Sequence, residues 1–143
     1  MIHVLITDDD ILVRISLLLL LSRVKDIRVI AEARDGQEAI ELADQLNPDV
    51  VTMDIQMSCM DGLKATRHIH TSQPHIKVLV AAGSYDEEIL SEVMLSGASG
   101  YLGKMDLEEF EPAIRAVYDG KFYLSKTIAE WKSRIANNNE SLS

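Results

Sequence analysis

The stretch DVVTMD, residues 49–54, is the part of the chain that decides the fold. Its first five residues form a nearly all-apolar run, which is typical of a parallel strand buried on both faces. Two other short apolar runs, residues 3–7 and 99–103, are also followed by charged side chains. The carboxyl ends of parallel strands meet at one edge of a sheet, so these charged residues are predicted to share one crevice.

The charged residues that follow the three runs have complementary chemistry. They are Asp8, Asp9 and Asp10 after the first run, Asp54 after the second and Lys104 after the third. Carboxylates a few ångströms apart repel one another, and they either take up a proton or hold a cation. Magnesium fits, because it takes oxygen ligands and is usually shared between carboxylates and a phosphate. An aspartate beside that metal can attack phosphorus, and a lysine can pair with phosphoryl oxygens.

The composition limits the class of protein. The 143 residues suit one domain, and 47% of them are hydrophobic, which is enough for a core. The net charge is −9 and the basic residues form no long block, so direct binding to nucleic acid by this segment is not expected. One cysteine, a start unlike a signal peptide and apolar runs too short to span a membrane predict a cytoplasmic domain without membrane contact.

Short apolar runs alternate along the chain with segments of helical period. The predicted strands are residues 3–7, 27–32, 49–53, 76–81 and a short one around 101–102. The predicted helices are residues 11–24, 35–46, 62–71, 84–96 and 107–119. This alternation predicts an α/β fold with a doubly wound five-stranded parallel sheet, and right-handed crossovers place its first and third strands side by side if the strand order is 2-1-3-4-5. The crevice between the first and third strands would then contain the aspartates.

Local signals mark several helix ends. Three pairs have the spacing of a capping box, namely Asp35 with Glu38, Ser84 with Glu87, and Asp106 with Glu109. If Asp106 caps the last of these helices, Pro112 falls inside it and should kink or delay it. Asp10 is interpreted as a helix cap rather than as a third metal ligand.

Four segments resemble a response-regulator receiver domain of the flavodoxin/CheY-like fold. They are VLITDDD, DGQEAIELADQLNPDVVTMDIQM, MDGLKATR and GASGYLGK, and the resemblance covers roughly residues 2–124. ASGYL followed by lysine, and the later AIRAVYDGKFYLS, are typical of the branch with a LuxR-type helix-turn-helix output domain. The resemblance implies a receiver domain over residues 1–124. Residues 125–143 would form a C-terminal linker helix and tail that lead to a DNA-binding domain outside this chain.

The resemblance also implies roles for individual residues. Asp54 would accept a phosphoryl group from a partner histidine kinase, which controls a transcriptional output domain, and Lys104 would contact that group. Mg2+ would be held by Asp9, Asp54 and the backbone carbonyl of Gln56, with Asp8 acting through water. No enzymatic role is expected beyond autophosphorylation and autodephosphorylation. The implied partners are the kinase, a second copy on activation, and DNA only through the output domain.

The chain departs from the family pattern at the end of the fourth strand. Receiver domains usually have Thr or Ser where this chain has Ala82, and alanine cannot donate the hydrogen bond that couples phosphorylation to the next helix. Ser84 is the nearest hydroxyl, although capping the next helix is its favoured interpretation. Tyr101 matches the aromatic residue that swings inward on activation in the family, or is an aromatic at the edge of the core. Beside the phosphorylation site, Ser58 and Cys59 replace the usual Pro-Gly.

Two alternative functions stay open from the sequence. Ala82 is the main support for a pseudo-receiver that binds partners without regulated phosphorylation. A magnesium-dependent phosphohydrolase would use the same aspartyl phosphate, but that class usually needs an acid two residues after the nucleophile, where Gln56 stands. Five consecutive leucines, residues 17–21, pass around a helix and predict at least one outward contact. The tail predicts an amphipathic helix from Lys126 that fades at residues 137–139.

Overall fold

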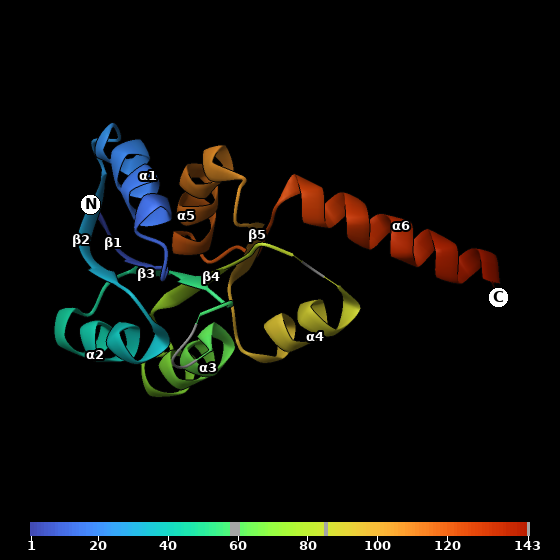
Figure 1. The fold of residues 1–143 in the computed structure, drawn as a ribbon, viewed down its shortest axis with the longest axis horizontal. Coiled ribbons are helices and arrows are strands. Elements are labelled where there is room, and N and C mark those ends of the chain that lie inside the picture. The colour runs from blue at the N-terminus through green and yellow to red at the C-terminus, as the bar shows by residue number, and fades with distance from the viewer. Residues whose placement is uncertain (58–60, 85, 143) are drawn as a thin grey trace.

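The computed structural model describes residues 1–57, 61–84 and 86–142, and these form a parallel sheet between two layers of helices (Figure 1). The strands are β1 (Ile2–Thr7), β2 (Ile27–Ala33), β3 (Val50–Asp54), β4 (Lys77–Ala82), β5 (Gly100–Gly103) and β6 (Tyr123–Leu124). The helices are α1 (Ile11–Ser22), α2 (Gly36–Leu46), α3 (Gly62–Ser72), α4 (Glu87–Leu95), α5 (Phe110–Tyr118) and α6 (Lys126–Leu142), with a 3-10 turn, η1 (Leu107–Glu109), before α5.

The sheet has the order β2-β1-β3-β4-β5-β6 and is parallel throughout. The predicted order 2-1-3-4-5 is therefore confirmed for the first five strands, and the predicted number of five is wrong. Gly120, with a φ of +86°, follows α5, and the chain then returns to pair Tyr123 with Gly100 and Leu124 with Tyr101. A two-residue strand has no periodicity to detect in a sequence, because its pairing depends on the neighbouring strand.

The two helical layers bury different faces of the sheet. Helices α1 and α5 cover one face, where Leu17 and Leu21 pack in one cluster with Phe110 and Ile114. Helices α2, α3 and α4 cover the other face, as Figure 1 shows. All five residues of β3 are buried, which explains why its sequence is almost continuously apolar.

The strand register places the first and third strand ends at the same level. Ile6 pairs with Thr52 and Thr7 with Met53, so Asp8, the residue after β1, lies beside Asp54, the last residue of β3. Side chains two residues apart point to the same face of a strand. Asp8 and Asp54 therefore both project on the side of the sheet that α1 and α5 cover.

Two of the predicted capping boxes are wrong. Helix α4 begins at Glu87, and its cap is Asp86, whose side chain accepts a hydrogen bond from Ile89 N. Ser84 lies before this cap and is not part of it. Asp106 makes no capping bond with its side chain. For the pair Asp35 and Glu38 the cap is confirmed, because Asp35 accepts from Glu38 N, but the Glu38 carboxylate accepts from Arg34 N rather than from Asp35 N.

Pro112 delays the helix that contains it. Residues 107–109 form the 3-10 turn η1, and the α-helical part begins only at Phe110. Pro112 is then the third residue of α5, in the first turn, where a backbone N–H has no partner within the helix. The expected delay is thus observed.

The C-terminal helix is longer than predicted and begins against the domain. Ser125 N–H donates to the Tyr101 carbonyl at 3.0 Å, and Ile128 is fully buried in the cluster that contains Tyr101. The helix does not fade at residues 137–139 but continues to Leu142, and Figure 1 shows it projecting away from the sheet. Its first turns are therefore part of the core, and its remainder extends outward.

Candidate functional site

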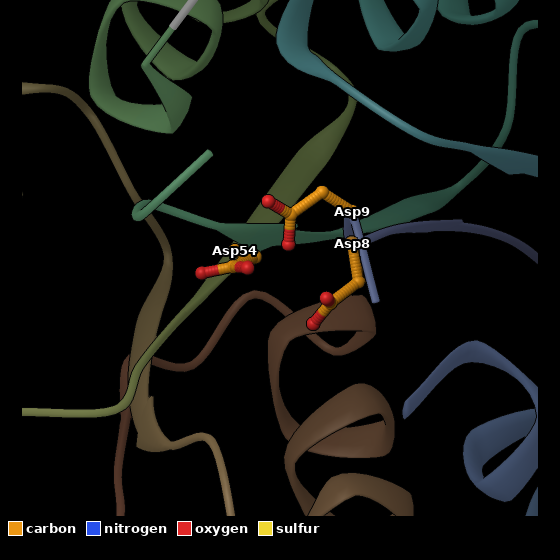
Figure 2. Close-up of side chains that lie close together, drawn as sticks. All are labelled: Asp8, Asp9 and Asp54. Atoms are coloured by element: carbon orange, nitrogen blue, oxygen red, sulfur yellow. The ribbon is translucent and has the colours of Figure 1, made fainter. Parts of the chain in front are cut away.

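The predicted crevice is formed by three carboxyl groups at the ends of β1 and β3 (Figure 2). Asp8, Asp9 and Asp54 each offer one oxygen, and these oxygens all lie within 4.8 Å of one another. Asp8 is 3% exposed and Asp54 1% exposed, whereas Asp9 is open to solvent. One side of the cluster is thus enclosed by the sheet, and the other is accessible to an incoming ligand.

Lys104 joins the two buried carboxylates. Its Nζ lies 2.9 Å from Asp54 Oδ2 and 3.3 Å from Asp8 Oδ1. The other Asp54 oxygen, Oδ1, accepts a hydrogen bond of 2.9 Å from the backbone N–H of Gln56. The Lys104 N–H in turn donates to the Ala82 carbonyl at 2.8 Å, which fixes the lysine to the end of β4. Both oxygens of Asp54 are therefore held from opposite sides.

Burial and neighbouring charges shift the pKa values of Asp8 and Lys104 in the crevice. Burial raises the pKa of the Asp8 carboxyl to about 6, and the neighbouring Asp54 charge acts in the same direction. Burial opposes the charge on the Lys104 ammonium, but its bonds to Asp54 and Asp8 outweigh this effect and raise the pKa of Lys104. Three carboxylates facing one ammonium leave an excess of negative charge, which a divalent cation would neutralise.

The oxygen donors fit a hard divalent cation. Magnesium binds one or two carboxylates and keeps several waters, and Asp9 is exposed to the solvent that would supply those waters. The acidic pocket of Asp8, Asp9 and Asp54 could therefore bind a metal ion. Asp10 is occupied elsewhere, because its side chain accepts from Leu12 N and caps α1, as predicted.

The end of β4, on the other side of the site, is apolar at Ala82 and exposed at the two residues that follow. Ala82 is buried and presents no hydroxyl, and the next two residues, Gly83 and Ser84, are exposed. The Gln56 side chain reaches across to both of these residues: its Oε1 accepts from Gly83 N at 3.3 Å and its Nε2 donates to Ser84 Oγ at 3.1 Å. The hydroxyl nearest to the missing one is thus already in contact with the loop after Asp54.

Tyr101 lies on β5 with its side chain fully buried. It belongs to the same hydrophobic cluster as Ala82 and Ile128, and Trp131 packs against that cluster from α6. The structure therefore has the aromatic ring inside the core, between the end of β4 and the start of α6. The predictions for Ser58 and Cys59 fall outside the described residues.

Two residues that support the site were missed in the sequence. A Cβ on Gly62 would overlap the Asp54 carbonyl oxygen, so only glycine allows α3 to start this close to β3. Arg14 is buried in α1, and its Nη1 donates to the Asp8 carbonyl at 2.8 Å. An arginine on the same helical face as Leu17 and Leu21 was the available signal, because a charge among core positions needs a buried partner.

Comparison with known proteins gives the family. The model for the response regulator receiver domain matches residues 4–115. The response regulator GacA of Pseudomonas aeruginosa is 40% identical over 131 residues, which are 91% of this chain and 61% of GacA. The transcriptional regulatory protein LnrK of Bacillus subtilis is 40% identical over 138 residues, 92% of this chain and 63% of LnrK. The chain thus spans about three-fifths of the length of these relatives.

A solved structure gives the same result. The crystal structure of a two-component response regulator of the LuxR family from Aurantimonas sp. SI85-9A1 has a TM-score of 0.86 and 31% identity. The match covers 93% of this chain and 97% of that one. The chain therefore belongs to the response regulator receiver domain family, in its LuxR branch. These relatives do not support the alternative of a pseudo-receiver.

Over the described residues, no helix is long and apolar enough to cross a membrane.

Proposed function

We propose that Asp54 of this receiver domain accepts a phosphoryl group from the phosphohistidine of a partner histidine kinase. The observation that carries the proposal is the arrangement of Asp54, which is 1% exposed, bonded to Lys104 and grouped with Asp8 and Asp9. An Asp54 carboxylate oxygen attacks phosphorus while the bond between phosphorus and the imidazole nitrogen breaks. The bonding electrons leave with the imidazole.

The residues around Asp54 have different roles in this transfer. Lys104, whose Nζ lies 2.9 Å from Asp54 Oδ2, pairs with the phosphoryl oxygens as a compact positive charge. Mg2+, when bound, neutralises charge on the phosphoryl oxygens and the carboxylates. Asp9, Asp54 and the Gln56 carbonyl would hold it, with Asp8 acting through a water molecule. The same site would release the phosphoryl group slowly to water, and we propose no activity of the chain beyond this autodephosphorylation and autophosphorylation.

The experiment is phosphorylation of the purified chain with acetyl phosphate and Mg2+, followed by intact-mass spectrometry. Wild type should gain one phosphoryl group, and Asp54→Asn should gain none. Asp49→Asn is a matched control, because Asp49 lies at the opposite end of β3 and bonds His3 N there. Failure of wild type to gain the group, or equal labelling of Asp54→Asn, would overturn the proposal. Turnover of added phosphate esters would favour a phosphohydrolase instead.

Ser84 is proposed as the hydroxyl that takes the place of the one missing at Ala82. Its Oγ already bonds Gln56 Nε2, and the capping of α4 by Asp86 leaves it available. With beryllofluoride bound at Asp54, Ser84→Ala should reduce the change in the environment of Tyr101, measured by NMR. An unchanged response in Ser84→Ala would exclude this role.

Residues 1–124 are proposed to be the receiver and residues 125–143 the linker towards a LuxR-type DNA-binding domain. The support is that GacA and LnrK are longer than this chain and that LnrK is a transcriptional regulatory protein. The protein would thus control transcription from the cytoplasm, and would contact DNA only through that output domain.

The partner on activation is proposed to be a second copy of the chain. Five apolar side chains of α1 are exposed, among them Leu12 at 70% and Leu19 at 59%, which satisfies the expectation of an outward leucine. A second copy would bury this row. Sedimentation with and without beryllofluoride tests this, and Leu12→Ser with Leu19→Ser should keep the activated protein monomeric. A dimer unaffected by these changes would exclude α1 as the contact.

A further inference from the structure

Arg14 is the one charged residue of helix α1, whose other residues are apolar or serine. Helix α1 has the sequence ILVRISLLLLLS, and the Arg14 side chain is only 10% exposed. Burial of a guanidinium is unfavourable unless it is paired and hydrogen-bonded. Two bonds supply this compensation: Nη1 donates to the Asp8 carbonyl at 2.8 Å, and Nε donates to Glu32 Oε1 at 3.3 Å.

The Asp8 carbonyl is part of the peptide unit that links Asp8 to Asp9. Fixing the plane of that unit restricts ψ of Asp8 and φ of Asp9, and these two angles aim both carboxylates. The same turn is held at Asp8 N, which donates to the Ala33 carbonyl at 3.1 Å, and at Asp8 Oδ1, which accepts from Asp10 N at 2.9 Å. Arg14 supplies the contact on the Asp8 carbonyl oxygen, the other backbone atom of Asp8 that can form a hydrogen bond.

Glu32 fixes the orientation of the Arg14 guanidinium. It lies next to the last residue of β2, and its carboxylate binds the Nε edge of the guanidinium while Nη1 points to Asp8. The planar fork of arginine makes both contacts at once, and a lysine ammonium is a point charge on a flexible stem. The geometry therefore requires arginine, with the carboxylate of β2 as its anchor.

We infer that Arg14, anchored by Glu32, is a positioning residue that sets the Asp8–Asp9 peptide for binding of a divalent cation. The inference rests on the proposed function for the identity of the site, but it concerns metal affinity rather than phosphoryl transfer. Arg14 reaches the cluster through a backbone carbonyl. Its loss should therefore weaken metal binding and leave the transfer rate at saturating metal close to wild type.

The test is the equilibrium binding of Mn2+, measured by electron paramagnetic resonance of the free ion, to wild type and to Arg14→Met, Arg14→Lys and Glu32→Gln. We expect about tenfold weaker binding for Arg14→Met, since loss of a residue that orients metal ligands typically reduces affinity by about ten- to a hundredfold. Arg14→Lys should fall between wild type and Arg14→Met. Arg34→Met is the matched control, because Arg34 is exposed and pairs only with Glu38 among the described residues, and it should bind as wild type.

The kinetic measurement separates positioning from general loss of structure. In phosphorylation by acetyl phosphate, Arg14→Met should need about ten times more Mg2+ for half-saturation, with a nearly unchanged rate at saturation. Thermal unfolding without metal reports on the fold, and if Arg14→Met does not fold, Glu32→Gln and Arg14→Lys carry the test.

Wild-type Mn2+ affinity in folded Arg14→Met would overturn the inference. So would an equal loss of affinity in Arg34→Met. Wild type that binds Mn2+ but is not phosphorylated would overturn the proposed function instead, and the Arg14 inference would still be decided by the binding data. The two failures are therefore distinguishable.

Discussion

The turn between β1 and α1 and the turn between β4 and α4 border the same crevice, yet they are held in different ways. The first turn is buried at Asp8, which is bonded through its backbone nitrogen, its carbonyl and its side chain. The second is exposed at Gly83 and Ser84, and the Gln56 side chain reaches both residues from the β3 loop.

This difference separates two requirements of a switch. Groups that bind a metal and receive a phosphoryl group must be placed before the reaction, because reorganisation raises the barrier. A turn that reports the reaction must instead move at small free-energy cost, which suits the exposed hydrogen bonds of Gly83 and Ser84 with Gln56. Variants at Lys104 and Asp8 test the first requirement, and variants at Ala82 and Gln56 test the second.

Lys104→Met should have the largest effect, since it removes the cation that both buried carboxylates share. Loss of one charge-stabilising group typically slows a reaction about a hundredfold, and we expect that reduction in phosphorylation by acetyl phosphate. Mass spectrometry over a time course measures the rate. Lys25→Met, at an exposed position, should react as wild type. A wild-type rate in Lys104→Met would mean that Lys104 does not assist phosphorylation, despite its contacts with Asp8 and Asp54.

Asp8 should make the stability of the metal-free protein depend on pH. Its pKa is about 6 in the folded chain against an ordinary value of 3.8, so the folded state binds more protons between these values. Stability should therefore fall by about 2 kcal/mol as pH rises from about 4 to about 6, and Mg2+ should restore it above this range.

Denaturant titrations across this pH range, compared between wild type and Asp8→Asn, measure the effect. Asp8→Asn should lose the decrease in stability. Asp10→Asn should keep it, because asparagine also caps a helix. The same slope in Asp8→Asn would assign the pH dependence to another group.

Ala82→Thr should strengthen the response of the second turn. It supplies a hydroxyl at the end of β4, and beryllofluoride should then change the NMR signals of Tyr101 more than it does in wild type. Ala82 is 1% exposed, so the larger side chain should destabilise the protein by about 1 kcal/mol. Ala82→Val has similar bulk without the hydroxyl and is the control. An equal response in both variants would assign the effect to bulk rather than to hydrogen bonding.

Gln56→Ala should have the smallest effect on stability, about 0.5 kcal/mol, since its side-chain bonds are exposed. Its local effect should be clear, because the Gly83 amide loses its acceptor and should exchange its hydrogen faster. Gln37→Ala, which removes an exposed bond to Glu41 on α2, should leave Gly83 unchanged. Unaltered exchange at Gly83 in Gln56→Ala would mean that the second turn is held by other contacts.

Residues whose positions follow from strand ends were predictable from the sequence. Asp8, Asp9, Asp54 and Lys104 come at the ends of short, mostly apolar runs, and parallel pairing brings such ends together. A parallel sheet covered by helices on both faces also followed from the alternation of strands and helices, but that alternation does not by itself fix the order of the strands.

Residues whose roles depend on distant partners were not predictable in this way. Glu109 has capping-box spacing from Asp106, but its carboxylate accepts from Tyr123 Oη and Lys126 N instead. Ser84 has the same spacing from Glu87, yet Asp86 lies closer to the first turn and caps it. A local pattern lists the groups able to form a bond, and tertiary packing selects among them.

Strand β6 has a consequence for association between copies of the chain. Without it, β5 would be the outer strand of the sheet, with a row of unpaired backbone groups available to a strand of another molecule. Tyr123 N and Ser125 N instead donate to the carbonyls of Ser99 and Tyr101. The two residues of β6 thus protect the edge of β5 from pairing with another molecule. A chain shortened to end at Asp119 should therefore aggregate through β5, even though every residue of the phosphorylation site is retained.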